Sequence, residues 1–193
     1  MGRMWDAQHD HLAGIGAVRD ATADPHHRAI LANYQEHVAL EQSGRWREIF
    51  ERGLIVEHPV YKTNMHGEVT VHDGADAVGR FYESINDGVF AEINERLAVN
   101  DWGFGSYSDV VEFVSAETAR ERGHEVDDPD ATYTLTIPQV MFWLYDERAL
   151  LLGEHLFVIG TPTLGKADPA DVLTKERIIE SCLPFIPEPA ARG

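Results

Sequence analysis

Residues 54–61, LIVEHPVY, contain the features that decide the fold of this chain. Leu54, Ile55 and Val56 are β-formers whose apolar side chains favour burial. Pro59 has no N–H to donate to a β-ladder, so regular pairing is expected to end or bulge at His58. The pattern predicts a short buried strand over 54–61 that ends at a titratable imidazole. Such a histidine can act chemically or can be satisfied by a backbone carbonyl.

Three helices are predicted around this strand. Asp24 and Pro25 form an N-cap and first-turn pair, and apolar residues then recur at helical spacing. The predicted helices are 25–42, 44–52 and 73–86. Residues 1–23 have weak periodicity, so we expect an N-terminal arm or a partial helix there.

After Gly88 the apolar residues alternate, which predicts antiparallel strands. The predicted strands are 89–99, 104–116, 131–145 and 149–160. Gly103 and Gly105 are expected at β-bulges. We expect loops over 62–72, with a small hairpin at His66-Gly67, and over the charged segment 117–130. The tail, 162–193, is expected to hold a short helix over 171–181.

Helices followed by strands indicate an α+β domain over 24–161 rather than a βαβ fold. The sheet must curl, and the three helices are expected to cover its concave face. The resulting cone would hold a small apolar ligand.

Composition narrows the function. The chain has 193 residues, 44% of them hydrophobic, which is enough for one domain with a substantial core. The 16 basic and 33 acidic residues give a formal charge of −17, which disfavours nucleic acid and anionic membranes as partners. We expect neither a membrane span nor a signal peptide. Cys182 is the single cysteine, which fits a reducing cytoplasm.

The order of elements over about 25–160 resembles the NTF2-like fold, also called the SnoaL-like or ketosteroid-isomerase-like cone. VEHPV at 56–60 is similar to the isomerase segment in which the catalytic aspartate precedes Pro-Val, with His58 at the position of the base. Tyr34 lies 24 residues earlier, as the oxyanion tyrosine does in that family. The segment 74–85, GADAVGRFYESI, is similar to the third helix of the isomerase and places Tyr82 as the support of Tyr34.

The chain also departs from that family. The isomerase has a protonated aspartate, a second oxyanion donor, on its next-to-last strand. Val140 or Met141 stands at this place here. The resemblance therefore implies the cone but not a faithful ketosteroid isomerase, because cyclases, dehydratases, epoxide hydrolases and binding modules share it.

The chemistry expected of these residues is proton transfer. A neutral imidazole at His58 is a competent general base near pH 7. A buried tyrosine hydroxyl, Tyr34 supported by Tyr82, can donate to a developing enolate. The alternative is that both tyrosines are core residues whose hydroxyls satisfy each other.

Two further acid–base candidates come from strand periodicity. Leu151, Gly153, His155 and Phe157 share one face by the two-residue period, and the resemblance implies that this face lines the cavity. The alternative for His155 is a core histidine satisfied by the backbone. Asp109 would face inward, paired with His58 or His155, or outward if a bulge changes the register.

The sequence also gives expectations for substrate contacts and for metal binding. Six residues are expected to contact substrate: Trp46, Phe50, Tyr61, Phe81, Met141 and Phe157. The ten histidines include the pairs His9/His11 and His26/His27, but none has a recognised metal-site spacing, so we expect no metal.

Together these observations predict a cofactor-independent isomerase, cyclase or dehydratase acting on a small apolar carbonyl or polycyclic compound. A homodimer through the convex sheet face is expected, because Val110, Val114, Val140, Phe142 and Leu144 form apolar outward rows. Two alternatives stay open. One is a non-catalytic binding or dimerising module, which a dry cavity with an outward His58 would favour. The other is a small structural subunit of an oxygenase.

Overall fold

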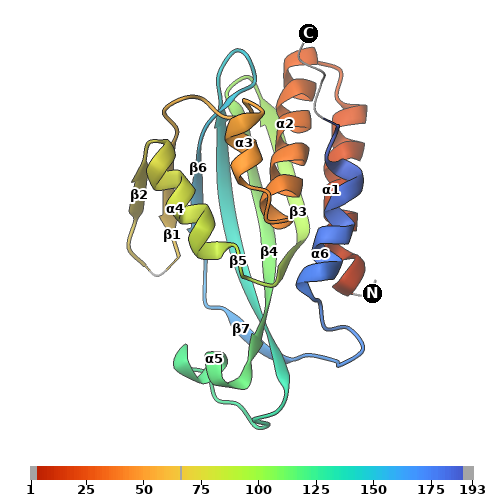
Figure 1. The fold of residues 1–193 in the computed structure, drawn as a ribbon, viewed down its shortest axis with the longest axis vertical. Helices are drawn as coiled ribbons and strands as arrows, with labels where there is room; N and C mark the ends of the chain where they lie inside the picture. The colour runs from red at the N-terminus through yellow and green to blue at the C-terminus, as the bar shows by residue number, and fades with distance from the viewer. Residues whose placement is uncertain (1–3, 66, 189–193) are drawn as a thin grey trace.

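The structure is a computed structural model that describes residues 4–65 and 67–188. It is a mixed α+β fold in which helices pack on a curved sheet, as the sequence predicts (Figure 1). The helices are α1 (Ala7–Ala21), α2 (Pro25–Gln42), α3 (Arg47–Glu51), α4 (Ala75–Ile85), α5 (Ala116–Glu121) and α6 (Lys175–Cys182). Short 3-10 turns, Met4–Asp6 and Leu183–Phe185, flank the first and last of them.

Seven strands form one sheet in the order β2-β1-β6-β5-β4-β3, and β7 pairs with the far end of β5. The strands are β1 (Val60–Asn64), β2 (Thr70–Asp73), β3 (Phe90–Asn100), β4 (Gly103–Ser115), β5 (Thr132–Tyr145), β6 (Leu151–Val158) and β7 (Thr163–Lys166). Neighbouring strands are antiparallel except for the parallel pair β1 and β6.

The predicted helix α2 begins at the expected cap. The Asp24 side chain accepts hydrogen bonds from the backbone N–H groups of His26 and His27, which would otherwise lack partners at a helix start. Pro25 follows at the first helical position, where its missing N–H costs nothing. The long helix then runs beside the sheet with its buried face toward β3 and β5.

The deciding stretch forms a different element from the one predicted. Within 54–61, Ile55 makes only an isolated parallel bridge to Leu151, and the first regular strand begins at Val60, after Pro59. The expected hairpin is present as β1 and β2, which pair from Val60 with Asp73 to Thr63 with Thr70. His66, named in that prediction, lies outside the described residues.

Four other local predictions are corrected. Residues 7–21 form a complete helix, and α1 packs against α2, β3 and α6. The segment 117–130 begins with α5, which is capped by the Ser115 side chain. Residues 163–166 form β7. The β4–β5 register is continuous through Gly103 and Gly105, so the bulges lie elsewhere.

The main core lies between the helices and the inner face of the sheet. Leu12 and Ile15 of α1, and Ile178 of α6, are fully or almost fully buried in it with the aromatic residues of α2, α4, β4 and β5. A smaller core beneath α5 contains Val114, Tyr133 and Leu135. The segments before and after the helix–strand domain therefore contribute to the same packed interior. Across residues 4–65 and 67–188, no helix combines the length and apolar character needed to cross a membrane.

Candidate functional site

Helix α2 carries one row of polar side chains into the core. Tyr34, His37 and Glu41 are three and four residues apart, so they share one helix face. Tyr34 is 1% exposed and His37 is fully buried. Side chains of this kind are rarely buried without partners, which indicates a site rather than ordinary packing.

His37 lies at the centre of a hydrogen-bonded cluster. Its Nε2 atom is 2.7 Å from the Tyr82 hydroxyl and 3.4 Å from Glu154 Oε1. The Tyr82 hydroxyl is 2.6 Å from that of Tyr61 and donates to Glu154 Oε1 at 3.3 Å. Glu41 Oε2 lies 3.8 Å from the same imidazole nitrogen. Two helices and two strands thus bring two carboxyls, one imidazole and two phenols together.

Burial sets the protonation of this cluster. Loss of solvent raises the pKa of Glu154 to about 8 and that of Glu41 to about 8, the second with help from the nearby Glu154 charge. Burial also lowers the pKa of His37 to about 4. At neutral pH the arrangement therefore holds protonated carboxyls around a neutral imidazole, and both carboxyls titrate close to the physiological range.

Aromatic rings form the wall beside this cluster. Trp46 stacks on Tyr82 at 5.8 Å between ring centroids, and Phe50, Phe81 and Tyr61 also contact the Tyr82 ring. A small cavity of about 10 Å³ lies here and is lined by Glu41, Gln42, Trp46, Tyr82, Ile85, Asn86, Phe90 and Lys175. Glu41 and Tyr82 are thus the members of the cluster that line this cavity.

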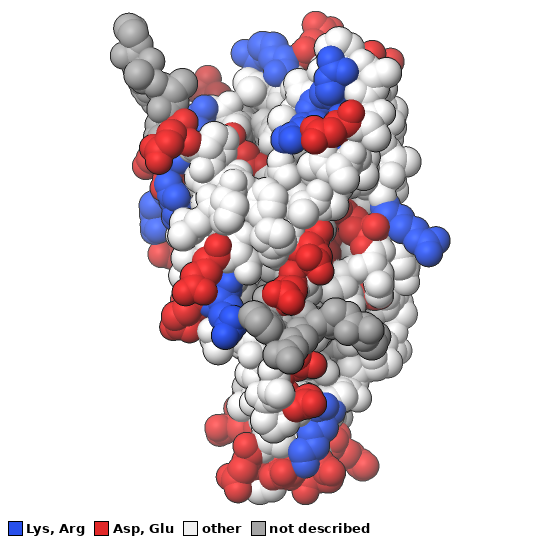
Figure 2. Space-filling model, turned by 90° about the vertical axis from the view of Figure 1, so that its right-hand side faces the viewer, with Lys and Arg blue, Asp and Glu red and all other residues white. Residues whose placement is uncertain are grey.

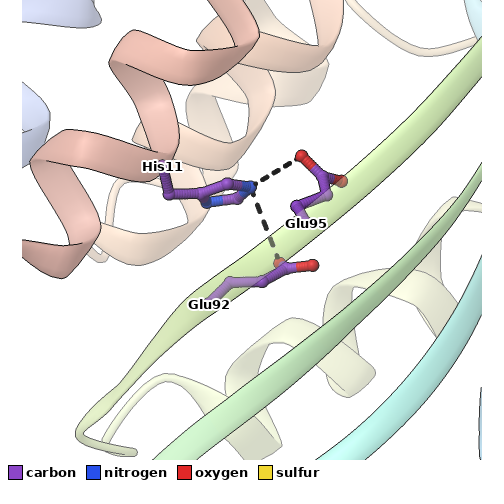
Figure 3. Close-up of side chains that lie close together, drawn as sticks. All are labelled: His11, Glu92 and Glu95. Atoms are coloured by element: carbon purple, nitrogen blue, oxygen red, sulfur yellow. Dashed lines mark hydrogen bonds and ion pairs between the residues drawn. The ribbon is translucent and has the colours of Figure 1, made fainter. Parts of the chain in front are cut away.

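A second buried cluster lies between helix α1 and strand β3. His11 Nε2 is 3.0 Å from Glu95 Oε2 and 4.0 Å from Glu92 Oε2, and Figure 3 shows both carboxylates approaching the same ring nitrogen. The Tyr34 hydroxyl donates to Glu95 Oε1 at 2.7 Å. Burial raises the pKa of Glu92. Burial alone would lower the pKa of His11, but the two nearby glutamates outweigh this effect and raise it.

A β-bulge aims the two glutamates together. Glu95 lies three positions after Glu92, an odd spacing that would place the two side chains on opposite faces of a regular strand. The β3–β4 register shifts between Ile93 and Arg96. Within this bulge Asn94 adopts φ 58°, and its side chain donates a hydrogen bond to Asp109 Oδ2 at 2.9 Å. The extra residue turns both carboxylates toward His11. In each of the two clusters, the three ligand-type atoms lie within 4.8 Å of one another, so either set has the spacing that one metal ion can bridge.

Several polar atoms of the interior have no partner from the protein. Among the described residues, Trp143 Nε1, Tyr145 Oη, Ser106 Oγ and the Nδ1 atoms of His11 and His37 are buried without a hydrogen bond. Buried polar groups are normally paired with protein, water or ligand. The inner face of the sheet is therefore a polar, not a purely apolar, lining.

His58 lies outside this interior. Its side chain is 73% exposed, and its Nε2 atom bonds Asp73 Oδ1 at 2.7 Å, at the edge of the β1–β2 hairpin. The predicted inward orientation is therefore contradicted. The irregular 56–59 segment turns the imidazole to solvent, because the core strand that would direct it inward begins only after Pro59.

His155 and Phe157 face outward because of a second bulge. Tyr145 pairs with Leu151 but Leu144 pairs with Gly153, so Leu152 is an extra residue on β6. Beyond it the alternation reverses: Glu154 faces Trp143 inside, and His155 pairs with the exposed Phe142. The prediction had placed these residues the other way round.

Asp109 takes the outward alternative, beside exposed Tyr107, and holds the β3 bulge. Tyr34 and Tyr82 are both buried as predicted, but their hydroxyls bond to Glu95 and to the His37 cluster respectively, with Trp143 packed between Tyr34 and His37. Met141 faces inward.

Sequence reasoning missed His11, His37, Glu41, Glu92, Glu95 and Glu154. His37 and Glu41 had a usable signal, because they continue the Tyr34 face of a predicted helix. The other four depend on α1 and on two bulges, which alternation alone does not reveal.

Comparison with known proteins bears on the fold. A structure from Jannaschia sp., described as a SnoaL-like polyketide cyclase, superposes with a TM-score of 0.52 over 71% of this chain and 90% of that one, at 9% identity. The chain has the NTF2-like fold. The NTF2-like resemblance predicted from the sequence is thereby confirmed at the level of architecture.

Two further structures match the chain more weakly. A polyketide cyclase structure from Xanthomonas campestris pv. campestris has 14% identity and a TM-score of 0.47 over 68% of this chain and 90% of that one. The CaMKII hub of S. rosetta has 13% identity and a TM-score of 0.42 over 72% and 99%. No family model matches the sequence, and no curated protein matches it.

Proposed function

We propose that this NTF2-like chain is a cofactor-independent proton-transfer enzyme of isomerase, cyclase or dehydratase type that acts on a small carbonyl compound. One observation carries the proposal: Glu41 and Tyr82 line a cavity with an aromatic wall, and His37 links them to the buried Glu154. At about 10 Å³ the cavity has room for one water molecule, so it must widen to admit a substrate. His58, Asp109 and His155, the acid–base residues predicted from the sequence, face away from this cavity and are given no role in it.

Glu41 is the proposed base. It lines the cavity, and with a pKa raised to about 8 it is mostly protonated at pH 7 but, once ionised, is a stronger base than an ordinary carboxylate. It would take the proton from the carbon next to the substrate carbonyl. The electron pair of that C–H bond then moves toward the carbonyl oxygen.

Tyr82 is the proposed donor to this oxygen, and Glu154, which does not line the cavity, lies behind it. The Tyr82 hydroxyl would turn its proton from Glu154 to the substrate oxygen with support from Tyr61, while Glu154, with its pKa raised to about 8, remains a neutral acid at pH 7. Neutral donors held in a dry site stabilise a developing oxyanion. Glu154 thus supplies, from β6, the buried carboxylic acid that is missing at Val140 and Met141.

His37 is the proposed link between the two carboxyls. Its Nε2 atom is within 3.8 Å of Glu41 and 3.4 Å of Glu154, and it stays uncharged because burial lowers its pKa to about 4. Return of the proton to a different carbon gives isomerisation. Loss of a β-hydroxyl as water gives dehydration, and attack of the enolate on a second carbonyl gives cyclisation.

The test is solvent-deuterium incorporation into a panel of small cyclic ketones. We expect Glu41→Gln to slow exchange by about 10²-fold or more, and Tyr82→Phe by about 10²- to 10³-fold. The profile of kcat/KM should be bell-shaped and centred near pH 8, rising as Glu41 ionises and falling as Glu154 ionises. Glu83→Gln, an exposed change on α4, is the matched control. Equal exchange in the wild type and Glu41→Gln would remove Glu41 as the base.

A non-catalytic binding module is the second candidate. It is favoured by the outward His58 and by the small volume of the cavity, about 10 Å³. This alternative predicts that phenol, a mimic of an enolate oxygen, binds in the wild type and loses affinity in Tyr82→Phe, while the ketone panel shows no enzyme-dependent exchange.

A further inference from the structure

The cluster of His11, Glu92 and Glu95 is separate from the proposed proton-transfer site. Its three side chains are 3%, 12% and 7% exposed, and they come from a helix and a strand far apart in the sequence. We propose that these three residues bind one divalent transition-metal ion, Zn²⁺ being the ion that this donor set fits. The site would fasten the N-terminal helix α1 to β3.

The distances fit a shared ion. Nitrogen and oxygen ligands lie about 2.0–2.2 Å from Zn²⁺ in a tetrahedral site, so two ligands of one ion are about 3.3–3.6 Å apart. His11 Nε2 lies 3.0 Å from Glu95 Oε2 and 4.0 Å from Glu92 Oε2, and all three atoms are within 4.8 Å of one another. Small side-chain rotations would complete the geometry.

The two carboxylates of the cluster also favour a bound cation. Two carboxylates converge on one imidazole in a buried place, where unbalanced charge is costly. A divalent ion bound between the two carboxylates would offset the charge of both. Imidazole with carboxylate oxygen is a donor set typical of Zn²⁺ among the first-row ions.

Neighbouring polar groups resemble the outer shell of a metal site. Tyr34 donates to Glu95 Oε1, which leaves Oε2 directed at His11. Ser108 and Gln139, bonded to each other, lie beside the Glu92 carboxylate. Carboxylate ligands of metals are commonly held by such second hydrogen bonds.

Unpaired polar atoms on α1 and β3 give an independent indication. Gln8 lies three residues before His11, hence on the same side of the helix, and it is fully buried. Both Gln8 amide atoms lack a partner among the described residues, and so does Glu92 Oε1 within the cluster itself. A hydrated ion would satisfy the free Glu92 oxygen, which the ion pair with His11 leaves unsatisfied.

The β3 bulge also borders the surface of the molecule. An open trough of about 630 Å³ on the surface is lined by Asn94, Glu95, Arg96, Tyr107 and Asp109. Glu95 therefore borders both the trough and the cluster, and it is the cluster residue nearest to an approach from solvent.

The His37, Glu41 and Glu154 trio has similar spacing but different surroundings. The Nε2 atom of His37 is already engaged by the Tyr82 hydroxyl at 2.7 Å. In the other cluster, the imidazole nitrogen meets only carboxylate oxygens. This difference selects the His11 cluster as the metal site.

The experiment is a Zn²⁺ titration of the chelator-stripped full chain, followed by calorimetry and thermal unfolding. We expect one ion per chain. With a Kd near 1 μM, 100 μM Zn²⁺ should raise the unfolding temperature by about 5–10 °C. His11→Asn and Glu95→Gln should each weaken binding by at least about 100-fold and remove the temperature shift, and Tyr34→Phe should weaken it by about 10- to 100-fold.

His9→Asn is the matched control, since His9 lies on the same helix with its side chain 52% exposed. Co²⁺ absorption bands provide a readout of the ligands that does not depend on stability, and they should persist in His9→Asn and vanish in His11→Asn. Absence of stoichiometric Zn²⁺ binding to the wild type would overturn the proposal. So would binding that survives in folded His11→Asn, or that is lost in His37→Asn instead.

Discussion

In the buried His37 cluster, the two glutamates are protonated and the histidine is neutral at pH 7. Burial raises the pKa values of Glu41 and Glu154 to about 8 and lowers that of His37 to about 4. Between the ordinary glutamate pKa of 4.5 and about 8, the folded chain therefore holds more protons on the two glutamates than the unfolded chain does. The free energy of unfolding must fall as pH rises through this window. His37 acts in the opposite direction, but only between about 4 and 6.5.

We therefore expect Glu154→Gln to flatten the pH dependence of stability between pH 6.5 and 8. Each titrating glutamate contributes a slope of up to about 1.4 kcal/mol per pH unit, and the amide removes one of them. Denaturant unfolding at the two pH values measures the difference. Glu147→Gln, a change in the exposed 146–148 turn, is the control and should keep the wild-type slope. An unchanged slope in Glu154→Gln would contradict a buried, protonated Glu154.

Two single-residue bulges decide what the sheet presents inward. Regular alternation along β6 correctly predicts that Leu151 faces inward. The prediction fails after the extra residue Leu152, because Glu154 rather than His155 then faces the core. The bulge in β3 similarly brings Glu92 and Glu95 to one face. Strand positions were predictable from period and turn residues, but a bulge shifts every later side chain and has no reliable mark in a single sequence.

Helix α1 was obscure for a different reason. Gly14 and Gly16 lower its helix propensity, and Gln8 and His11 occupy buried positions where apolar residues would have revealed a face. By contrast, α2 and α4 were predicted because their caps and apolar stripes agree with their tertiary contacts. Of the elements that escaped prediction, α1 supplies His11 to the second cluster, whereas the predicted helices α2 and α4 supply His37, Glu41 and Tyr82 to the first.

Gly153 tests how tightly the β6 bulge is packed. A Cβ added there would lie 1.9 Å from the Val60 carbonyl oxygen, so Gly153→Ala must push β1 away from β6. We expect a loss of about 3 kcal/mol or more in the free energy of unfolding. Gly14→Ala is the matched control: no atom lies within 4 Å of its added Cβ, and the change should stabilise α1 by about 0.5–1 kcal/mol. Equal stability of Gly153→Ala and the wild type would contradict the close approach of the two strands.

Charge is distributed unevenly over the whole molecule. Figure 2 shows acidic side chains gathered at the end of the molecule occupied by α5 and the following loop, where Glu117, Glu121, Glu125, Asp127 and Asp130 are exposed. The whole chain has a formal net charge of −17, and this acidic end repels polyanions and the same end of another copy. Self-association is therefore expected through a different, less charged surface.

The outer face of the sheet offers such a surface. Trp102, Tyr107 and Phe142 are 46%, 44% and 40% exposed, and Trp102 contacts Phe142 there. The expected apolar row is revised at Val110 and Val114. Both share the strand face of the buried Ser106 and Ser108 rather than that of exposed Tyr107, and Val114 is buried beneath α5. We propose that this outer patch, Trp102, Tyr107 and Phe142, pairs with a second copy of the chain.

Sedimentation at micromolar concentration should give a homodimer for the wild type and a monomer for Phe142→Asp, because a buried unpaired carboxylate would oppose the apolar contact. Leu183→Asp is the control, since Leu183 is 50% exposed but lies in the 3-10 turn after α6 rather than on the sheet. Circular dichroism must show that Phe142→Asp keeps its fold, which is expected because the side chain lies outside both cores. A monomeric wild type, or a dimer that resists Phe142→Asp but dissociates in Leu183→Asp, would move the interface away from the sheet.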